Sequence, residues 1–155
     1  MERRDFLVSS SSATALALAA ASGLTPAHAQ NAAGWNKAAF DSKTLADAAK
    51  ALGASSAPVE SKDLILQAPE IAENGAVVRI GAQSNIANTS QISFVVEKNP
   101  SALAASFDIP AGTDANVSTN IKMGQSSNVY ALVKAGDKYF YAVKEVKVTL
   151  GGCGG

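Results

Sequence analysis

Short segments of alternating apolar and polar residues, separated by turn-forming residues, constrain the fold of this chain more than any other feature. Residues 117–123 (VSTNIKM) and 146–150 (VKVTL) alternate clearly, as strands with one buried face do. Seven segments have a strand-like composition. They cover residues 63–67, 76–81, 92–97, 104–109, 116–123, 128–134 and 138–150.

The residues between these segments are typical of tight turns. Ala-Gly-Asp-Lys at 135–138 predicts a hairpin, and residues 97–100 and 110–114 contain Pro, Gly, Asn or Asp. No long helical pattern separates the strands. The chain is therefore expected to be mainly β, an immunoglobulin-like antiparallel β-sandwich of about seven strands.

One short helix is predicted before the strands, over about 44–53. Thr44 and Asp47 have the spacing of a capping box. An apolar stripe follows at helical spacing, and Gly53 is suited to end the helix. Residues 30–40 are expected to form a loosely held arm, and residues 68–75 a tight turn.

The first 29 residues have the layout of an export signal. Charged residues come first, a Ser/Ala/Leu-rich apolar run follows, and Ala27-His28-Ala29 ends the segment. The pair Arg3-Arg4 followed by Phe6-Leu7 is similar to a twin-arginine signal, although Glu2 departs from that pattern. We expect cleavage after 29, a β-sandwich domain over 30–150, and export to the periplasm.

The composition disfavours enzymatic chemistry and nucleic-acid binding. The chain has 13 basic and 13 acidic residues, and losing Glu2, Arg3, Arg4 and Asp5 leaves 11 of each. A neutral domain offers no electrostatic attraction to nucleic acid or to an acidic membrane. His28 is the single histidine and would leave with the signal. Without histidine and with one cysteine, we expect no catalytic residues, metal site or cofactor.

Two other groups of residues are candidates for a catalytic or ligand-binding site. Glu70 and Glu73 are a possible carboxylate pair, but such spacing is more often a solvated turn. The aromatic residues Tyr130, Tyr139, Phe140 and Tyr141 are expected to divide between core and surface, or to line a subunit contact, more often than to bind a ligand.

The segment 151–155 reads Gly-Gly-Cys-Gly-Gly, and Cys153 is the sole cysteine. Glycines give the backbone large freedom and make the segment as thin as a polypeptide can be. Such an arm would extend a thiol about 10 Å beyond the last strand and into a narrow channel of another protein. No cation that would lower the pKa of the thiol is adjacent in the sequence, so a partner is expected to activate it.

This segment, with the export signal and the order of helix and strands, resembles the SoxY family of sulfur-substrate carriers from the periplasmic thiosulfate-oxidising Sox system. Residues 69–76 (PEIAENGA) are also similar to that family. The resemblance extends over nearly the whole mature chain, and its most specific part is 151–155.

The resemblance implies a carrier without catalysis of its own. Cys153 would be the covalent attachment site for thiosulfate, and Gly151, Gly152, Gly154 and Gly155 would form the flexible arm. The implied partners are a SoxZ-like small sandwich subunit in a heterodimer, a c-type cytochrome that couples the sulfur, a hydrolase that releases sulfate, and in some systems a molybdenum–haem sulfur dehydrogenase.

Three alternatives stand beside this reading. The first is an exported structural or binding sandwich whose Cys153 forms an intermolecular disulfide. The second is a binding module whose 151–155 segment is idle. The third is a ubiquitin-like sulfur carrier activated at Gly-Gly, which the export signal disfavours because that activation takes place in the cytoplasm.

Overall fold

The computed structural model describes residues 35–149. Contacts divide the chain into two units, Met1–Trp35 and Asn36–Gly155. Trp35 is the one described residue of the first unit, and the fold is that of the second. The predicted export signal over 1–29 and the segment 151–155, with Cys153, lie outside the described residues.

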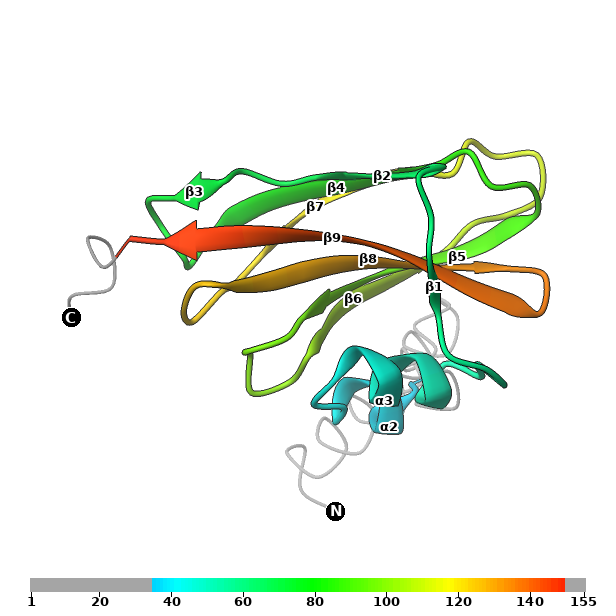
Figure 1. Cartoon of the computed structure of the whole chain (residues 1–155), viewed down its shortest axis with the longest axis horizontal. Helices are drawn as coiled ribbons and strands as arrows, with labels where there is room; N and C mark the ends of the chain where they lie inside the picture. The colour runs from blue at the N-terminus through cyan, green and yellow to red at the C-terminus, as the bar shows by residue number, and fades with distance from the viewer. Residues whose placement is uncertain (1–34, 150–155) are drawn as a thin grey trace, which may run out of the picture. The chain divides into compact units, whose positions relative to one another are not determined.

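The larger of two sheets has the order β1-β9-β8-β5-β6, and β3 also pairs with β9 (Figure 1). Neighbours among β6, β5, β8 and β9 are antiparallel, whereas β1 and β3 run parallel to β9. The predicted β8–β9 hairpin is confirmed, with Gly136 at a φ of 59°. The strands of this sheet are β1 (Val59–Glu60), β3 (Ile71–Ala72), β5 (Thr89–Val96), β6 (Leu103–Asp108), β8 (Ser127–Ala135) and β9 (Lys138–Val148).

The smaller sheet contains three antiparallel strands in the order β2-β4-β7. They are β2 (Leu64–Gln67), β4 (Val78–Ser84) and β7 (Asn116–Ile121). Each of the seven predicted segments overlaps one strand of the two sheets. The largest difference is in β4, which was expected over 76–81 and continues to Ser84.

The inner faces of the two sheets enclose the main core. Alternate residues of β5 are fully buried there, namely Ile92, Phe94 and Val96. They meet Val78, Ile80 and Ala82 of β4 in the same cluster. Burial of one such side chain contributes about 1.5–3 kcal/mol. The alternation seen in the sequence therefore determines which face of each strand is buried, and the expected sandwich is confirmed.

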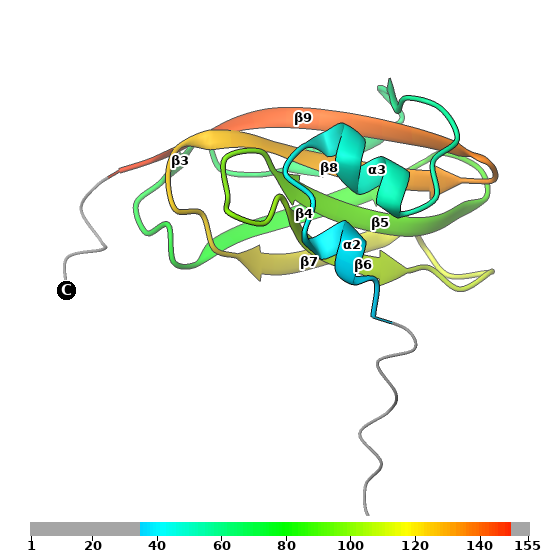
Figure 2. The same ribbon diagram turned by 90° about the horizontal axis from the view of Figure 1, so that it is seen from below.

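Two short helices, α2 (Lys37–Phe40) and α3 (Leu45–Ala51), lie over the outer face of the larger sheet (Figure 2). Ala39 and Ala48 are fully buried in a second cluster, against Val95 and Leu103 of the sheet. A third cluster joins the buried residues Ala49, Leu132 and Tyr139. The larger sheet is therefore apolar on both faces where the helices cover it.

Helix α3 begins and ends at the signals found in the sequence. The Thr44 hydroxyl accepts a hydrogen bond from the Asp47 amide at 3.1 Å and donates one to the Asp47 carboxylate at 2.8 Å. Gly53 has a φ of 102°, which favours glycine after a helix end. The predicted helix is confirmed. The carboxylate, however, binds the capping hydroxyl rather than a free amide.

Three sequence expectations need correction. Residues 36–40 are not a loose arm, because the Asn36 side chain caps α2 and its amide nitrogen donates to the Ala51 carbonyl at 2.8 Å. Residues 68–75 are not simply a turn, because they contain β3. The parallel pairing of β1 and β3 also departs from the expected purely antiparallel arrangement.

Candidate functional site at the end of strand β9

Strand β9 leads towards the Gly-rich segment, and its last residues are held on one side by β3. Ile71 is paired with Lys147 and Ala72 with Val148. The Lys147 amide donates to the Glu70 carbonyl at 2.9 Å, and the Thr149 amide donates to the Ala72 carbonyl at 3.1 Å. Backbone pairing therefore continues to the last described residue.

The opposite side of β9 is held by the loop before β8. The Val148 amide donates to the Ser126 hydroxyl oxygen at 2.9 Å. Gly75 approaches from the segment after β3, where the Met123 amide donates to the Gly75 carbonyl at 2.7 Å. A Cβ atom at residue 75 would lie 2.9 Å from a methyl group of Val148. The residues before position 150 are thus held from both sides.

Residues 69–76, which resemble the family in sequence, have a role in the fold that the sequence did not reveal. This segment supplies both β3 and the close approach at Gly75. A two-residue strand that pairs through its backbone leaves no side-chain periodicity to detect. The glycine at 75 was the one available signal, because glycine in a short loop often marks a close backbone approach.

The four aromatic residues divide between core and surface, which confirms the more conservative reading. Tyr139 is buried, and its hydroxyl donates to the Leu52 carbonyl at 2.6 Å, which ties β9 to the end of α3. Tyr130 and Tyr141 are half-buried and pack edge to face, with ring centres 5.9 Å apart. Phe140 is also half-buried.

Burial raises the pKa of the Tyr139 hydroxyl above its ordinary value. Burial also raises the pKa of Tyr130, with smaller contributions in the same direction from the Glu97 carboxylate and from Tyr141. The side-chain hydrogen bond with Asn128 acts in the opposite direction. Both tyrosines therefore stay neutral at neutral pH, as packing residues do.

The possible carboxylate pair is exposed, since both Glu70 and Glu73 lie at the surface.

Within residues 35–149, no three His, Cys, Asp or Glu side chains gather where they could hold a metal ion. No helix in the same range is long and apolar enough to cross a bilayer.

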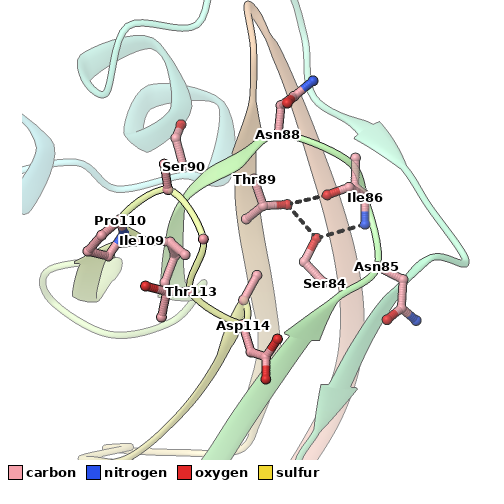
Figure 3. A pocket seen from close by; sticks show the side chains of 13 residues that line it. Ser84, Asn85, Ile86, Asn88, Thr89, Ser90, Ile109, Pro110, Thr113 and Asp114 are labelled. Atoms are coloured by element: carbon pink, nitrogen blue, oxygen red, sulfur yellow. Dashed lines mark hydrogen bonds between the residues drawn. The ribbon is translucent and has the colours of Figure 1, made fainter.

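A cavity of about 510 Å³ lies at the other end of the sandwich (Figure 3). Two of its polar side chains bond to each other: the Ser84 and Thr89 hydroxyls are 2.7 Å apart, and Thr89 donates to the Ile86 carbonyl at 2.8 Å. Thr89 pairs with Ala135, which pairs with Lys138 at the start of β9. This cavity therefore lies far from the end of β9.

Comparison with known proteins identifies the family. A family model described as sulfur oxidation protein SoxY matches residues 48–153. The match covers more than half of the chain and reaches Cys153. The chain belongs to the SoxY family. The sulfur carrier protein SoxY from Chlorobium limicola f thiosulfatophilum is similar in structure, with a TM-score of 0.63 and 38% sequence identity over 74% of this chain and 99% of that one.

Structural similarity extends beyond SoxY proteins at low sequence identity. A variant of superoxide reductase (neelaredoxin) from Ignicoccus hospitalis matches with a TM-score of 0.50 and 17% identity, over 64% of this chain and 87% of that chain. At this identity the likeness shows the sandwich fold alone. No curated protein sequence matches the chain.

Proposed function

We propose that this SoxY-family chain is a non-catalytic sulfur carrier that holds thiosulfate-derived intermediates on Cys153 and presents them to partner enzymes. The observation that carries the proposal is the family match, which extends through the single cysteine of the chain. The similar structure from Chlorobium limicola f thiosulfatophilum is itself a sulfur carrier protein.

The geometry at the end of β9 supports a fixed attachment point for the segment that follows, and the sequence of that segment supports a slender arm. The backbone is paired as far as Thr149, and Cys153 follows four residues later. Four extended residues span at most about 13–14 Å. Flanking glycines add no side chain to the width of this segment. A thiol held in this way suits delivery into a channel in a partner enzyme.

The carrier cycle then needs two steps, both performed by partners. In the first, the Cys153 thiol and thiosulfate lose one proton and two electrons and form a sulfur–sulfur bond, with a c-type cytochrome as electron acceptor. In the second, a hydrolase adds water to the terminal sulfonate. The products are sulfate, one proton and a persulfide, Cys–S–SH, at Cys153. A sulfur dehydrogenase would oxidise the persulfide in systems that contain one.

The proposal includes a location and a partner. The export signal predicted over 1–29 supports a location in the periplasm, where the c-type cytochrome of the first step would also act. A SoxZ-like sandwich subunit completes the carrier as a heterodimer. The alternative is an exported binding module joined to another molecule through a disulfide at Cys153.

Reconstitution with thiosulfate and the partner enzymes tests the proposal. Cys153→Ser should abolish thiosulfate-dependent cytochrome reduction while circular dichroism stays unchanged. A matched variant keeps the sulfur but thickens the arm by replacing Gly151, Gly152, Gly154 and Gly155 with alanine. It should react with thiol reagents like the wild type, yet lose most of its activity with the enzymes.

The two variants separate attachment from delivery. Full activity of Cys153→Ser would overturn the carrier proposal. Full activity of the alanine variant would overturn the requirement for a slender arm. Under the alternative, activity would follow the disulfide-linked dimer, which a gel without reductant detects. Cys153→Ser would then lose both the dimer and the activity, and the alanine variant would keep both.

A further inference from the structure

The outer face of the smaller sheet contains a second cavity, of about 550 Å³, that neither the fold nor the proposed function explains. Its floor is formed where β2, β4 and β7 run side by side. Gln67, Gly81 and Ser118 are paired across these strands. Their neighbours Ile80 and Ala82 point into the core, so the three residues line the opposite, outer face.

Gly81 forms part of the floor of this cavity. It stands in the middle of the central strand, where a β-branched or aromatic residue would be more usual. A Cβ atom at this position would lie 3.3 Å from the Val117 carbonyl oxygen and 3.4 Å from the Gln67 side-chain oxygen. Glycine therefore allows the Gln67 side chain to lie close over the central strand, at the floor of the cavity.

Two cationic side chains line the same cavity. Arg79 is two residues before Gly81 on β4 and is exposed. Lys144 comes from β9 in the other sheet, and its ammonium group donates to the Ala68 carbonyl at 3.1 Å. That contact holds the lysine at the edge of the cavity rather than extended into solvent.

The charge of the cavity is uncompensated. Its lining contains no Asp or Glu, and among residues 35–149 no carboxylate oxygen lies within 4 Å of Arg79 or Lys144. Arg79 is also the single arginine beyond the predicted signal. A guanidinium group presents several N–H donors in a planar fork that matches oxoanions. Gln67 and Ser118 add neutral donors.

We propose that this cavity binds a small sulfur oxoanion through its –SO₃ group. Arg79 and Lys144 provide the positive charge, and Gln67 and Ser118 provide further hydrogen bonds. The choice of a sulfur oxoanion rests on the proposed carrier function, whereas the preference for an oxoanion rests on the cavity itself.

The same –SO₃ chemistry has two sources. One is a free ion such as sulfate or thiosulfate, and the other is the sulfonate end of an adduct carried on Cys153. The site would retain a released or incoming ion in the first case. In the second it would hold a loaded arm between visits to partner enzymes.

Nuclear magnetic resonance titration tests the free ion in the Cys153→Ser variant, which cannot carry an adduct. Sodium sulfate and sodium thiosulfate are compared with sodium chloride at equal ionic strength. Saturable shifts of the Gly81 and Ser118 amides are expected with the oxoanions alone. Arg79→Gln or Lys144→Gln should weaken binding about tenfold, as loss of a charge-assisted hydrogen bond does. Lys138→Gln, at the start of β9 and outside the cavity lining, is the matched control.

The second arm uses the wild type loaded by tetrathionate. The Cys153 thiolate attacks a central sulfur of tetrathionate, forms the Cys–S–S–SO₃⁻ adduct and releases thiosulfate. After free ions are removed, shifts at Gly81 and Ser118 that disappear in Arg79→Gln would identify the adduct as the ligand.

Saturable shifts in the first arm, or adduct-dependent shifts in the second, support the site if the charge variants lose them. Linear, chloride-like shifts in the first arm together with no shifts at Gly81 and Ser118 in the second, or equal effects of Lys138→Gln and Arg79→Gln, would overturn it. Because the first arm lacks the cysteine, its result does not depend on whether Cys153 carries sulfur. A failure of the cavity and a failure of the carrier proposal are thus distinguishable.

Discussion

Replacement of Gly75 by alanine tests the account of how the end of β9 is held. The new methyl group would lie well inside van der Waals contact with the Met123 carbonyl oxygen and 2.9 Å from a methyl group of Val148. To relieve this contact, the backbone must move apart and stretch the 2.7 Å hydrogen bond from the Met123 amide to the Gly75 carbonyl.

The magnitude follows from these two effects. Overpacking costs about 1–3 kcal/mol, and a weakened hydrogen bond about 0.5–1.5 kcal/mol. The lower entropy of the unfolded alanine chain offsets about 0.4–1 kcal/mol. We therefore expect Gly75→Ala to lower the free energy of unfolding by about 2 kcal/mol.

Urea denaturation followed by circular dichroism measures this loss. The matched control is Gly124→Ala, because a Cβ atom there would meet nothing within 4 Å. We expect the control to stay within about 0.5 kcal/mol of the wild type or to gain stability. Equal stability of the two variants would refute the close approach at Gly75.

Three further predictions concern the helix and the tyrosines. Tyr139→Phe should lower the free energy of unfolding by about 1 kcal/mol, because the Leu52 carbonyl loses its 2.6 Å partner; the control Tyr141→Phe should cost less in the same urea assay. Thr44→Ala should cost about 1 kcal/mol through loss of the N-cap, and an unchanged urea midpoint would contradict this. The contribution of Tyr130 and Tyr139 to stability should be constant below about pH 10 and fall above it, because both have a raised pKa when folded and ionise first in the unfolded chain; unfolding midpoints that do not fall between pH 10 and pH 11 would exclude this linkage.

Most of the sandwich could be predicted because its strands are long and half-buried. Residues 117–121 alternate between exposed and at least partly covered positions in the structure, as the sequence pattern requires. Helix α3 could be predicted equally well, since Thr44 and Gly53 mark its ends through local chemistry. Such signals depend on neighbouring residues and need no knowledge of the rest of the fold.

The remaining elements depend on distant partners. Helix α2 has four residues and is held by packing of Ala39 and by the hydrogen bond from Asn36 to Ala51. A helix this short is not stable by itself, so its sequence contains no helical pattern long enough to detect. The parallel strands β1 and β3 are formed by backbone pairing with β9. The cavity between Arg79 and Lys144 joins residues 65 positions apart on different sheets. No local pattern connects them.

The most direct test of the carrier account is intact-protein mass spectrometry with peptide mapping of residues around Cys153. The protein is purified from cells growing on thiosulfate and measured with and without a thiol reductant. The account predicts sulfur or sulfonate adducts on Cys153 that the reductant removes. An unmodified thiol, or only a protein–protein disulfide, would contradict it.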